Sequence, residues 1–383
     1  MFGNLKELPI PVGKYTVGVK QMDFIDQSRK QVFDFEDTNS FRELPVVLYY
    51  PSDSNEGKQC ADYMPAEVAN VMSKTSHRLV SKNIYKIKTH CYKEIAISTK
   101  KDNFPVILFN HGYGTYIESS TILLSNLASA GYIVVSIGHP YEAVAVKYLD
   151  GRVVKQHKDA IKRMNLSESD FKKSKVIELD ELATELSKYV HDVNNPFENF
   201  KIWQKDSSFI LDELENLNTG KIESIFKNKL NLGLGVGIFG HSFGGTTAVQ
   251  TCLKDKRVKC GINLDGSGFC NDLFNDIKKP FMFIGSRNTG KTMKIVHKYN
   301  SEDSSIVLVG DTEHSGYTDG LFIARQLNLF NLIGKREKYD FNEIYTKYVM
   351  SFFDKYLLSN DDIEFIDIKY DNVDFEEKKK SLV

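Results

Sequence analysis

Residues 236–248 read VGIFGHSFGGTTA, and this stretch restricts the fold more than any other part of the chain. It contains the pattern G-x-S-x-G, from Gly240 to Gly244, between an apolar run and a run of small residues. The pattern is typical of a serine on a sharp turn between a buried strand and a helix, with strained backbone angles and an exposed hydroxyl. Glycines two positions before and after the serine leave room for that turn. We therefore predict a nucleophile elbow centred on Ser242.

The rest of the chain predicts an α/β fold whose central sheet is mostly parallel and is covered by helices on both faces. From residue 104 onward, short and continuously apolar runs alternate with helical stretches, as expected for parallel strands buried on both faces. Together with the elbow, this order of elements predicts the α/β-hydrolase fold. The expected strands are residues 43–54, 104–110, 132–138, 235–240, 261–265, 281–285 and 304–310, and the expected helices include 63–80, 115–131 and 341–357.

We expect a single domain over residues 1–383, because no low-complexity linker or internal repeat interrupts the pattern. Residues 147–230 are rich in Lys, Glu and Asp and have a helical period, which predicts an inserted helical cap and a return helix. Residues 358–383 form a C-terminal tail, whose alternating apolar residues predict a late edge strand or an extended arm.

A nucleophilic serine needs a general base, and the base needs a carboxylate that orients it. In the α/β-hydrolase fold these partners follow the serine in the order acid, then histidine. Only His297 and His314 follow Ser242 in this chain. His297 lies in an expected helix, whereas His314 lies in a polar loop directly after the strand 304–310, where the base of this fold belongs. We predict that His314 is the base.

Three carboxylates compete for the role of the acid. Asp265 ends the strand that follows the nucleophile helix, Asp311 lies at the end of the last strand, and Glu313 is adjacent to the histidine and poorly placed to reach its ring. The strand 281–285, whose end usually carries the acid in this fold, is followed by SRNTG, which contains no carboxylate. This gap favours Asp265, and Asp311 remains the alternative.

Backbone N–H groups are expected to stabilise the negative oxygen of the tetrahedral intermediate. One should belong to Phe243, directly after the nucleophile, and the other to a loop after an early strand. The segment NHGYG (110–114) offers Tyr113 for the second position. We expect His111 to orient that loop rather than to take part in the chemistry.

Residues 285–292, GSRNTGKT, compete with this interpretation because they match the phosphate-binding loop of nucleotide hydrolases in full. An apolar strand precedes them, and Asp311 could serve as a magnesium ligand. However, only about a hundred residues follow residue 280, too few for a nucleotide-binding domain with its own core. A second pattern, G-x-G-x-x-G at 235–240, places two glycines inside the expected strand instead of after it. We interpret both patterns as accidental matches.

Composition argues against several other classes of protein. The 50 Lys and Arg nearly balance the 51 Asp and Glu, whereas nucleic-acid binders usually carry a basic excess. The N-terminus has no apolar segment typical of a signal peptide, and no run approaches the ~18 apolar residues of a membrane span. Five cysteines without C-x-x-C spacing argue against a disulfide framework and a zinc site. We expect a cytoplasmic protein with no metal, no cofactor and no nucleic-acid partner.

Segments over most of the chain resemble the intracellular and plasma platelet-activating factor acetylhydrolases and their bacterial α/β-hydrolase relatives. The resemblance implies Ser242 as nucleophile, Asp265 as acid, His314 as base, and oxyanion amides at Phe243 and Tyr113. It also implies calcium-independent hydrolysis of a short-acyl ester without a cofactor. The segments that carry the resemblance include VGKYTVGV, LYYPSD, PVILFNHGYG, GVGIFGHSFGGTTA, RVKCGINLDG and VLVGDTEHSGYTD.

We therefore expect a serine carboxylic-ester hydrolase that forms an acyl-enzyme on a small-molecule or lipid ester, such as an acetylated phospholipid-like substrate. Residues 266–269, GSGF, depart from the bulky aromatic residue that family members often carry there. Polyester, aryl-ester and thioester hydrolysis are alternatives on the same triad, and a phosphate-loop nucleotide hydrolase or a non-catalytic binding protein would be a different class. Residues 321–334, LFIARQLNLFNLIG, are expected mainly to pack against the sheet, with weak contact with a lipid surface as a further use.

Overall fold

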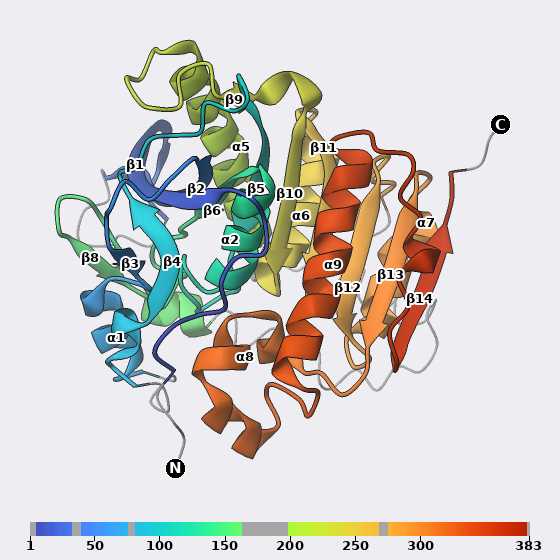
Figure 1. Cartoon of the computed structure of the whole chain (residues 1–383). Helices are drawn as coiled ribbons and strands as arrows, with labels where there is room; N and C mark the ends of the chain where they lie inside the picture. The colour runs from blue at the N-terminus through green and yellow to red at the C-terminus, as the bar shows by residue number, and fades with distance from the viewer. Residues whose placement is uncertain (1–4, 33–39, 76–80, 163–197, 268–274, 381–383) are drawn as a thin grey trace.

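The computed structural model describes residues 5–32, 40–75, 81–162, 198–267 and 275–380 (Figure 1). The fold is built on one twelve-stranded β-sheet. Its centre is parallel and comprises, in spatial order, β6 (Ile133–Ile137), β5 (Phe104–Asn110), β10 (Val236–His241), β11 (Val258–Leu264), β12 (Phe281–Ser286) and β13 (Ser304–Val309).

Further strands extend this parallel centre at both ends. At one end β2 pairs antiparallel with β6, and at the other β14 pairs antiparallel with β13. β14 lies in the C-terminal tail, for which the alternating apolar residues predicted a late edge strand or an extended arm, and it forms an edge strand. The added strands are β2 (Phe41–Ser52), β1 (Thr16–Lys30), β4 (Lys88–Lys93) and β3 (Cys60–Asp62) beyond β6, β14 (Val373–Lys378) beyond β13, and the short β9 (Leu230–Asn231) beside β5.

Helices cover both faces of the sheet. Because successive side chains of a strand point to opposite faces, the sheet has one hydrophobic core on each face. In β5, Ile107 and Phe109 belong to one core cluster, and Val106 and Leu108 belong to the other. Figure 1 shows α9 in front of the sheet and α6 behind it. Burial on both faces is the reason why the central strands are continuously apolar. The helices are α2 (Thr121–Ala130) and α9 (Lys338–Tyr356) on one face, and α5 (Glu198–Thr219), α6 (Phe243–Lys254) and α7 (Gly290–Tyr299) on the other.

This architecture confirms the predicted fold class. Each expected strand after residue 100 lies within three residues of its predicted bounds. Helix α2 ends at Gly131, whose φ of 113° is left-handed and therefore favours glycine at this position. Because β10 leads directly into α6, the carboxyl edge of the sheet carries the strand-to-helix turn that the G-x-S-x-G pattern predicted.

Two expected helical segments differ in the structure. Where residues 147–230 begin, the chain forms a separate antiparallel pair, β7 (Ala145–Lys147) with β8 (Val153–Lys155), and a helix begins only at residue 158. The intervening loop contains Asp150–Gly151, a turn signal that favours a hairpin over a helix, and Gly151 has a φ of 91°. Residues 163–197 of the expected cap lie outside the described residues. The expected helix 63–80 is shorter, because α1 spans only Ala66–Met72.

Among the helices in the described part of the chain, none is both long enough and apolar enough to cross a lipid bilayer.

Candidate active site

Ser242 lies where β10 passes into α6. Its backbone has φ 57° and ψ −120°, angles that residues other than glycine rarely adopt. The neighbouring glycines permit the turn, because a Cβ at Gly244 would lie 2.0 Å from Asn110 O and a Cβ at Gly240 would lie 2.3 Å from the Gly244 carbonyl carbon. The sharp turn therefore depends on residues without side chains at both flanking positions.

His314 places its imidazole between Ser242 and Asp265. Nε2 lies 2.8 Å from Ser242 Oγ, and Nδ1 lies 2.6 Å from Asp265 Oδ2. An ionised carboxylate can only accept hydrogen bonds, so Nδ1 donates its proton to Asp265 and Nε2 accepts from the serine hydroxyl. The His314 side chain is 48% exposed, whereas the Asp265 side chain is fully buried. The base is open to a substrate while the acid is shielded from water.

Asp265 directly follows β11 and has a φ of 49°. Its Oδ1 accepts hydrogen bonds from Ser286 N–H at 2.7 Å and from the Thr289 hydroxyl at 2.5 Å. Burial alone would raise the pKa of Asp265, but the hydrogen bond and charge of His314, together with Thr289 and Ser286, outweigh burial and lower that pKa. Asp265 is therefore ionised at neutral pH.

The other titratable groups weighed for these roles make different contacts. Asp311 accepts a hydrogen bond from the Asn372 side chain at 2.7 Å. Glu313 accepts from two asparagine side chains. His297 lies on α7, with Nδ1 2.8 Å from Ser304 Oγ. Of the acids considered, Asp265 is the one that the structure brings to the imidazole of the base.

The loop after β5 lies directly beside Ser242. A Cβ at Gly112 would lie 3.4 Å from Ser242 Cβ, and Tyr113 is the next residue. Phe243 is the first residue of α6, so its N–H belongs to the helical turn that has no acceptor within the helix. The two backbone segments expected to stabilise an oxyanion thus lie next to the serine.

His111 holds the shape of this loop. Its Nδ1 donates to Gly112 O at 2.7 Å, and its Nε2 accepts from His139 N–H at 3.3 Å. Burial, reinforced by the nearby His139, lowers the pKa of His111 to about 3. The neutral ring is therefore committed to structural hydrogen bonds on both sides, as expected from the sequence.

His241, the residue before the nucleophile, makes a contact that the sequence did not suggest. Its Nε2 donates to the backbone oxygen of His314 at 3.0 Å. Burial, with a smaller contribution from the charge of His314, lowers the pKa of His241 to about 3, so the ring is neutral. The contact joins the elbow to the loop of the base. No signal pointed to it, because His241 occupies a free position of the motif.

A buried ionic cluster fastens α5 to the ends of β5 and β6. Arg42 donates to Asp206 from two nitrogens, at 3.1 and 2.6 Å, and His139 Nδ1 donates to Asp206 at 2.8 Å. His139 Nε2 lies 2.9 Å from the Asn110 side-chain amide. Burial alone would raise the pKa of Asp206, but Arg42 and His139 outweigh it and hold that pKa well below its usual value. Asn110 begins the loop beside Ser242, so this cluster supports the site.

Aromatic side chains on α5 pack against both residues expected to form the oxyanion hole. The Phe200 ring stacks on Phe243 with centroids 3.9 Å apart, and Trp203 meets Phe243 edge-on at 4.7 Å. Tyr113 lies 5.2 Å from Phe243 and 6.1 Å from Trp203. The Trp203 indole also donates to the Glu142 carboxylate at 2.8 Å. Helix α5 thus forms a wall beside the nucleophile.

A second buried polar group joins the segment after His314 to α2. Asp319 accepts hydrogen bonds from Tyr63 OH at 2.9 Å and from Ile122 N–H at 3.1 Å. Tyr63 OH also lies 3.0 Å from Tyr116 OH. Burial raises the pKa of Asp319 to about 8, despite these donors. This group links three segments that are distant in the sequence.

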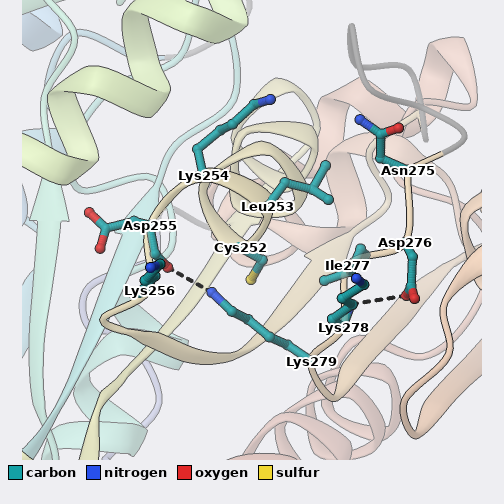
Figure 2. A pocket seen from close by; sticks show the side chains of 10 residues that line it. All are labelled: Cys252, Leu253, Lys254, Asp255, Lys256, Asn275, Asp276, Ile277, Lys278 and Lys279. Carbon is teal, nitrogen blue, oxygen red and sulfur yellow. Dashed lines mark hydrogen bonds between the residues drawn. The ribbon is translucent and has the colours of Figure 1, made fainter.

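Figure 2 shows a pocket whose lining residues precede β11 and β12, which places it at the opposite edge of the sheet from Ser242 at the end of β10. Residues 252–256, from the end of α6 and the loop before β11, line one side, and residues 275–279, before β12, line the other. Lys279 extends across it and donates to Asp255 O. Ligands of α/β proteins bind at the carboxyl ends of the strands, which is where Ser242 and Asp265 lie. The pocket is therefore separate from the candidate active site.

Comparisons with known proteins identify a family and several relatives that are similar to this chain. A family model described as platelet-activating factor acetylhydrolase, isoform II, matches residues 2–376. A relative from Cavia porcellus, described as platelet-activating factor acetylhydrolase, is 26% identical over 331 residues, which cover 81% of this chain and 72% of that protein. One from Bos taurus with the same description is 24% identical over 374 residues, covering 92% and 77%.

Among solved structures, a ferulic acid esterase from Streptomyces cinnamoneus is similar to this chain, with a TM-score of 0.75 and 22% sequence identity. The similarity covers 97% of this chain and 99% of that protein. At this level of identity the likeness concerns the fold, and it agrees with the α/β-hydrolase architecture described above.

Proposed function

We propose a reaction for this chain from the premise that it belongs to the platelet-activating factor acetylhydrolase, isoform II, family. Membership of this family makes the chain a carboxylic-ester hydrolase. Ser242 is the nucleophile, His314 the general base, and Asp265 the residue that orients the base. The observation that carries this assignment is the continuous line of contacts, 2.8 Å from Ser242 Oγ to His314 and 2.6 Å from His314 to Asp265.

Ser242 Oγ attacks the ester carbonyl while His314 Nε2 takes the hydroxyl proton. The tetrahedral intermediate collapses as His314 returns that proton to the departing alkoxide, which leaves an acyl group on Ser242. A water molecule, deprotonated by the same nitrogen, then attacks the acyl-enzyme, and His314 returns the proton to Ser242 Oγ as the bond to the acyl group breaks and the carboxylic acid leaves. Asp265, ionised and bonded to Nδ1, stabilises the imidazolium formed in both steps.

The N–H groups of Phe243 and Tyr113 bind the negative oxygen of each tetrahedral intermediate. Their place beside Ser242, on the elbow and on the loop after β5, supports this assignment. Losing one such donor typically costs about 3 kcal/mol of transition-state stabilisation. The packing of α5 against both side chains would keep these backbone groups in place before the substrate arrives.

The substrates that we propose are esters of short acyl groups, including acetylated phospholipid-like molecules. Support comes from the relatives, which are described as acetylhydrolases of platelet-activating factor. Hydrolysis of polyesters, aryl esters or thioesters by the same three residues is the alternative, because the triad acts on the acyl group and does not by itself select the alcohol.

We also propose weak contact with a lipid surface through residues 329–332. Leu329 is 75% exposed, Phe330 62% and Leu332 43%, although Leu321 and Phe322 at the start of the same segment are buried. Adjacent apolar side chains that project into water are typical of an interaction site. The segment follows the loop of His314, so contact with lipid would bring the site close to a lipid ester.

A cytoplasmic location is a further proposal. The cysteines in the described part of the chain, Cys60, Cys91, Cys252 and Cys260, are free thiols, as is usual in a reducing compartment. Fractionation of cells that express the chain with an epitope tag would test the location, and recovery from the medium or the envelope would contradict it.

Hydrolysis of p-nitrophenyl esters from acetate to octanoate, by wild type and by Ser242→Ala, tests the reaction. We expect turnover of the acetate or butyrate ester and a loss of at least about a thousandfold in the variant. Stoichiometric labelling of wild type by a fluorophosphonate, absent in the variant, would identify Ser242 as the nucleophile. Equal activity in the two proteins would contradict the proposed function.

A further inference from the structure

The segment GSRNTGKT, residues 285–292, has no role in the reaction described so far. It begins in the last residues of β12 and leads into α7, which starts at Gly290. In sequence it matches a loop that binds phosphate through backbone N–H groups and a hydroxyl. The structure brings an anion to the first half of this segment, and the anion is the carboxylate of Asp265.

The contacts divide the two oxygens of that carboxylate between different partners. Oδ1 accepts from Ser286 N–H at 2.7 Å and from the Thr289 hydroxyl at 2.5 Å, while Oδ2 accepts from His314 at 2.6 Å. Hydrogen bonds to an ionised acceptor are roughly twice as strong as those between neutral groups. Asp265 has no exposed side-chain surface, so water does not compete for Oδ1.

The loop also approaches the carboxylate closely. A Cβ at Gly285 would lie 2.8 Å from Asp265 Oδ1 and 2.9 Å from Thr289 Oγ1. A larger residue at this position would therefore displace one partner or the other. Thr289 makes no side-chain cap of α7. Its hydroxyl lies 2.5 Å from Asp265 Oδ1 and 3.0 Å from Ser286 O, so the charged carboxylate is the closer of these two acceptors.

We propose that Ser286 N–H and the Thr289 hydroxyl form a cradle for Asp265, and that Thr289 is a positioning residue for the reaction of Ser242. The inference rests on the proposed function. The cradle holds the carboxylate in the orientation that presents Oδ2 to His314, and it spreads part of the negative charge over Oδ1. The donors are of the types that a phosphate-binding loop uses, a backbone N–H and a hydroxyl, but Ser286 and Thr289 occupy free positions of that pattern, so the match in sequence stays accidental.

Replacement of Thr289 by Val keeps the shape of the side chain and removes the donor. We expect kcat to fall about ten- to a hundredfold, in line with the loss of a hydrogen bond to a charged group, and KM to change by less than about twofold. The acid limb of kcat/KM should move to higher pH, because a carboxylate with fewer donors holds a proton on the neighbouring imidazole more strongly. Thr289→Ser, which restores a hydroxyl, should recover most of kcat and the original pH profile.

Two control variants separate this effect from general damage. Thr251→Val makes the same chemical change in α6, where the hydroxyl bonds to Thr247 O. Arg287→Ala alters the same loop at an exposed side chain that pairs with Asp374. Both controls should keep wild-type kcat and pH profile, and fluorophosphonate titration would correct every rate for the fraction of active enzyme.

The decisive measurement combines Thr289→Val with Asp265→Asn. If Thr289 acts through Asp265, the double variant should lose less than about twofold beyond Asp265→Asn alone, because residues that act as a unit are not additive. The proposal would be wrong if the loss of kcat in the double variant equals the product of the losses in the two single variants. It would also be wrong if Thr289→Val keeps the wild-type kcat and pH profile. In that case a large loss in Ser242→Ala would still uphold the proposed function, so the two failures are distinguishable.

Discussion

At the scale of single residues, hydrogen-bond partners distinguish the two aspartates that were candidates for the catalytic acid. Asp265 and Asp311 both follow sheet strands, but Asp265 bonds to His314 and Asp311 bonds to Asn372. We predict that Asp265→Asn lowers kcat by about a thousandfold or more, because the base then loses its orienting carboxylate. Asp311→Asn should stay within about threefold of wild type. Steady-state hydrolysis of p-nitrophenyl acetate measures both, and the opposite ranking would refute the assignment of the acid.

A second prediction at this scale concerns Asp319, whose pKa burial raises to about 8. The unfolded chain releases this proton near pH 4. Between these values the folded state binds more protons than the unfolded state, so the contribution of Asp319 to stability is fully present below about pH 4 and is lost as pH rises to about 8. Asp319→Asn removes this titration.

Urea unfolding of wild type and Asp319→Asn at pH 5 and pH 8 would test this effect. The stability of the variant relative to wild type should improve by at least about 1 kcal/mol at the higher pH, which corresponds to less than one pKa unit of linkage. A relative stability that is independent of pH, or that moves in the other direction, would show that Asp319 is ionised in the folded protein. Asp303→Asn, at a carboxylate that accepts from Tyr356 near the surface, is the matched control.

At the scale of elements, α5 depends on a buried charge pair. Asp206 lies on α5 and binds Arg42 of β2 and His139 after β6, all at most 1% exposed. Arg42 also lies 3.7 Å from Glu142, a longer contact than the 2.6 Å to Asp206. Asp206→Ala therefore weakens the compensation of a buried charge and should destabilise the protein by about 3 kcal/mol. Asp212→Ala, on the same helix but in an exposed pair with Arg257, should cost less than about 1 kcal/mol.

Thermal and urea unfolding measure both variants of α5. An Asp206→Ala protein as stable as Asp212→Ala would mean that the helix is held by its apolar face alone. Activity is a second readout, because Asn110 connects the same cluster to the loop of the proposed oxyanion hole. We expect kcat of Asp206→Ala to fall even at temperatures where circular dichroism shows the protein folded.

Some of the helices and strands could be predicted from the local sequence pattern alone, and others could not. The strands of the parallel centre were predicted to within a few residues because each is a short apolar run that needs no information about its neighbours. The pair β7–β8 was not predicted, because the charged composition of 147–230 suggested a helical period and hid the Asp150–Gly151 turn. A three-residue strand contributes too few residues to establish a period of two.

At the scale of the whole molecule, the proposed contact with lipid should appear only when the ester is part of a surface. We predict that Leu329→Ser combined with Phe330→Ser weakens binding to phosphatidylcholine vesicles by about tenfold or more, since each apolar side chain contributes on the order of 1–2 kcal/mol when buried. Hydrolysis of soluble p-nitrophenyl acetate should stay within about twofold of wild type.

Vesicle sedimentation and hydrolysis of an acetylated phospholipid in the same vesicles provide the measurements. Leu149→Ser combined with Ile366→Ser is the matched control, because these side chains are 65% and 64% exposed and lie elsewhere in the chain. Equal losses in the two double variants would indicate that residues 329–332 have no special part in surface contact.

The sequence by itself determined the fold class, the position of the elbow at Ser242 and the loop that carries His314. These features depend on short segments, in which the spacing of apolar residues and glycines restricts the backbone directly. The resemblance to known hydrolases implied Ser242 and His314 by a separate route, together with Asp265. Their roles in catalysis stay predictions until the variants are measured.

The sequence favoured Asp265 and left Asp311 as the alternative, and only the tertiary structure brought one of them, Asp265, to the imidazole. Only the structure also showed what residues 285–292 contact. β11 and β12 are neighbours in the sheet, so the ends of both strands meet at one edge and Thr289 reaches Asp265 across 24 positions of sequence. The same holds for Asp206 with Arg42, which are 164 positions apart. Such contacts follow from the order of strands and the packing of helices. A motif within one short segment contains no information about the segment that will lie beside it.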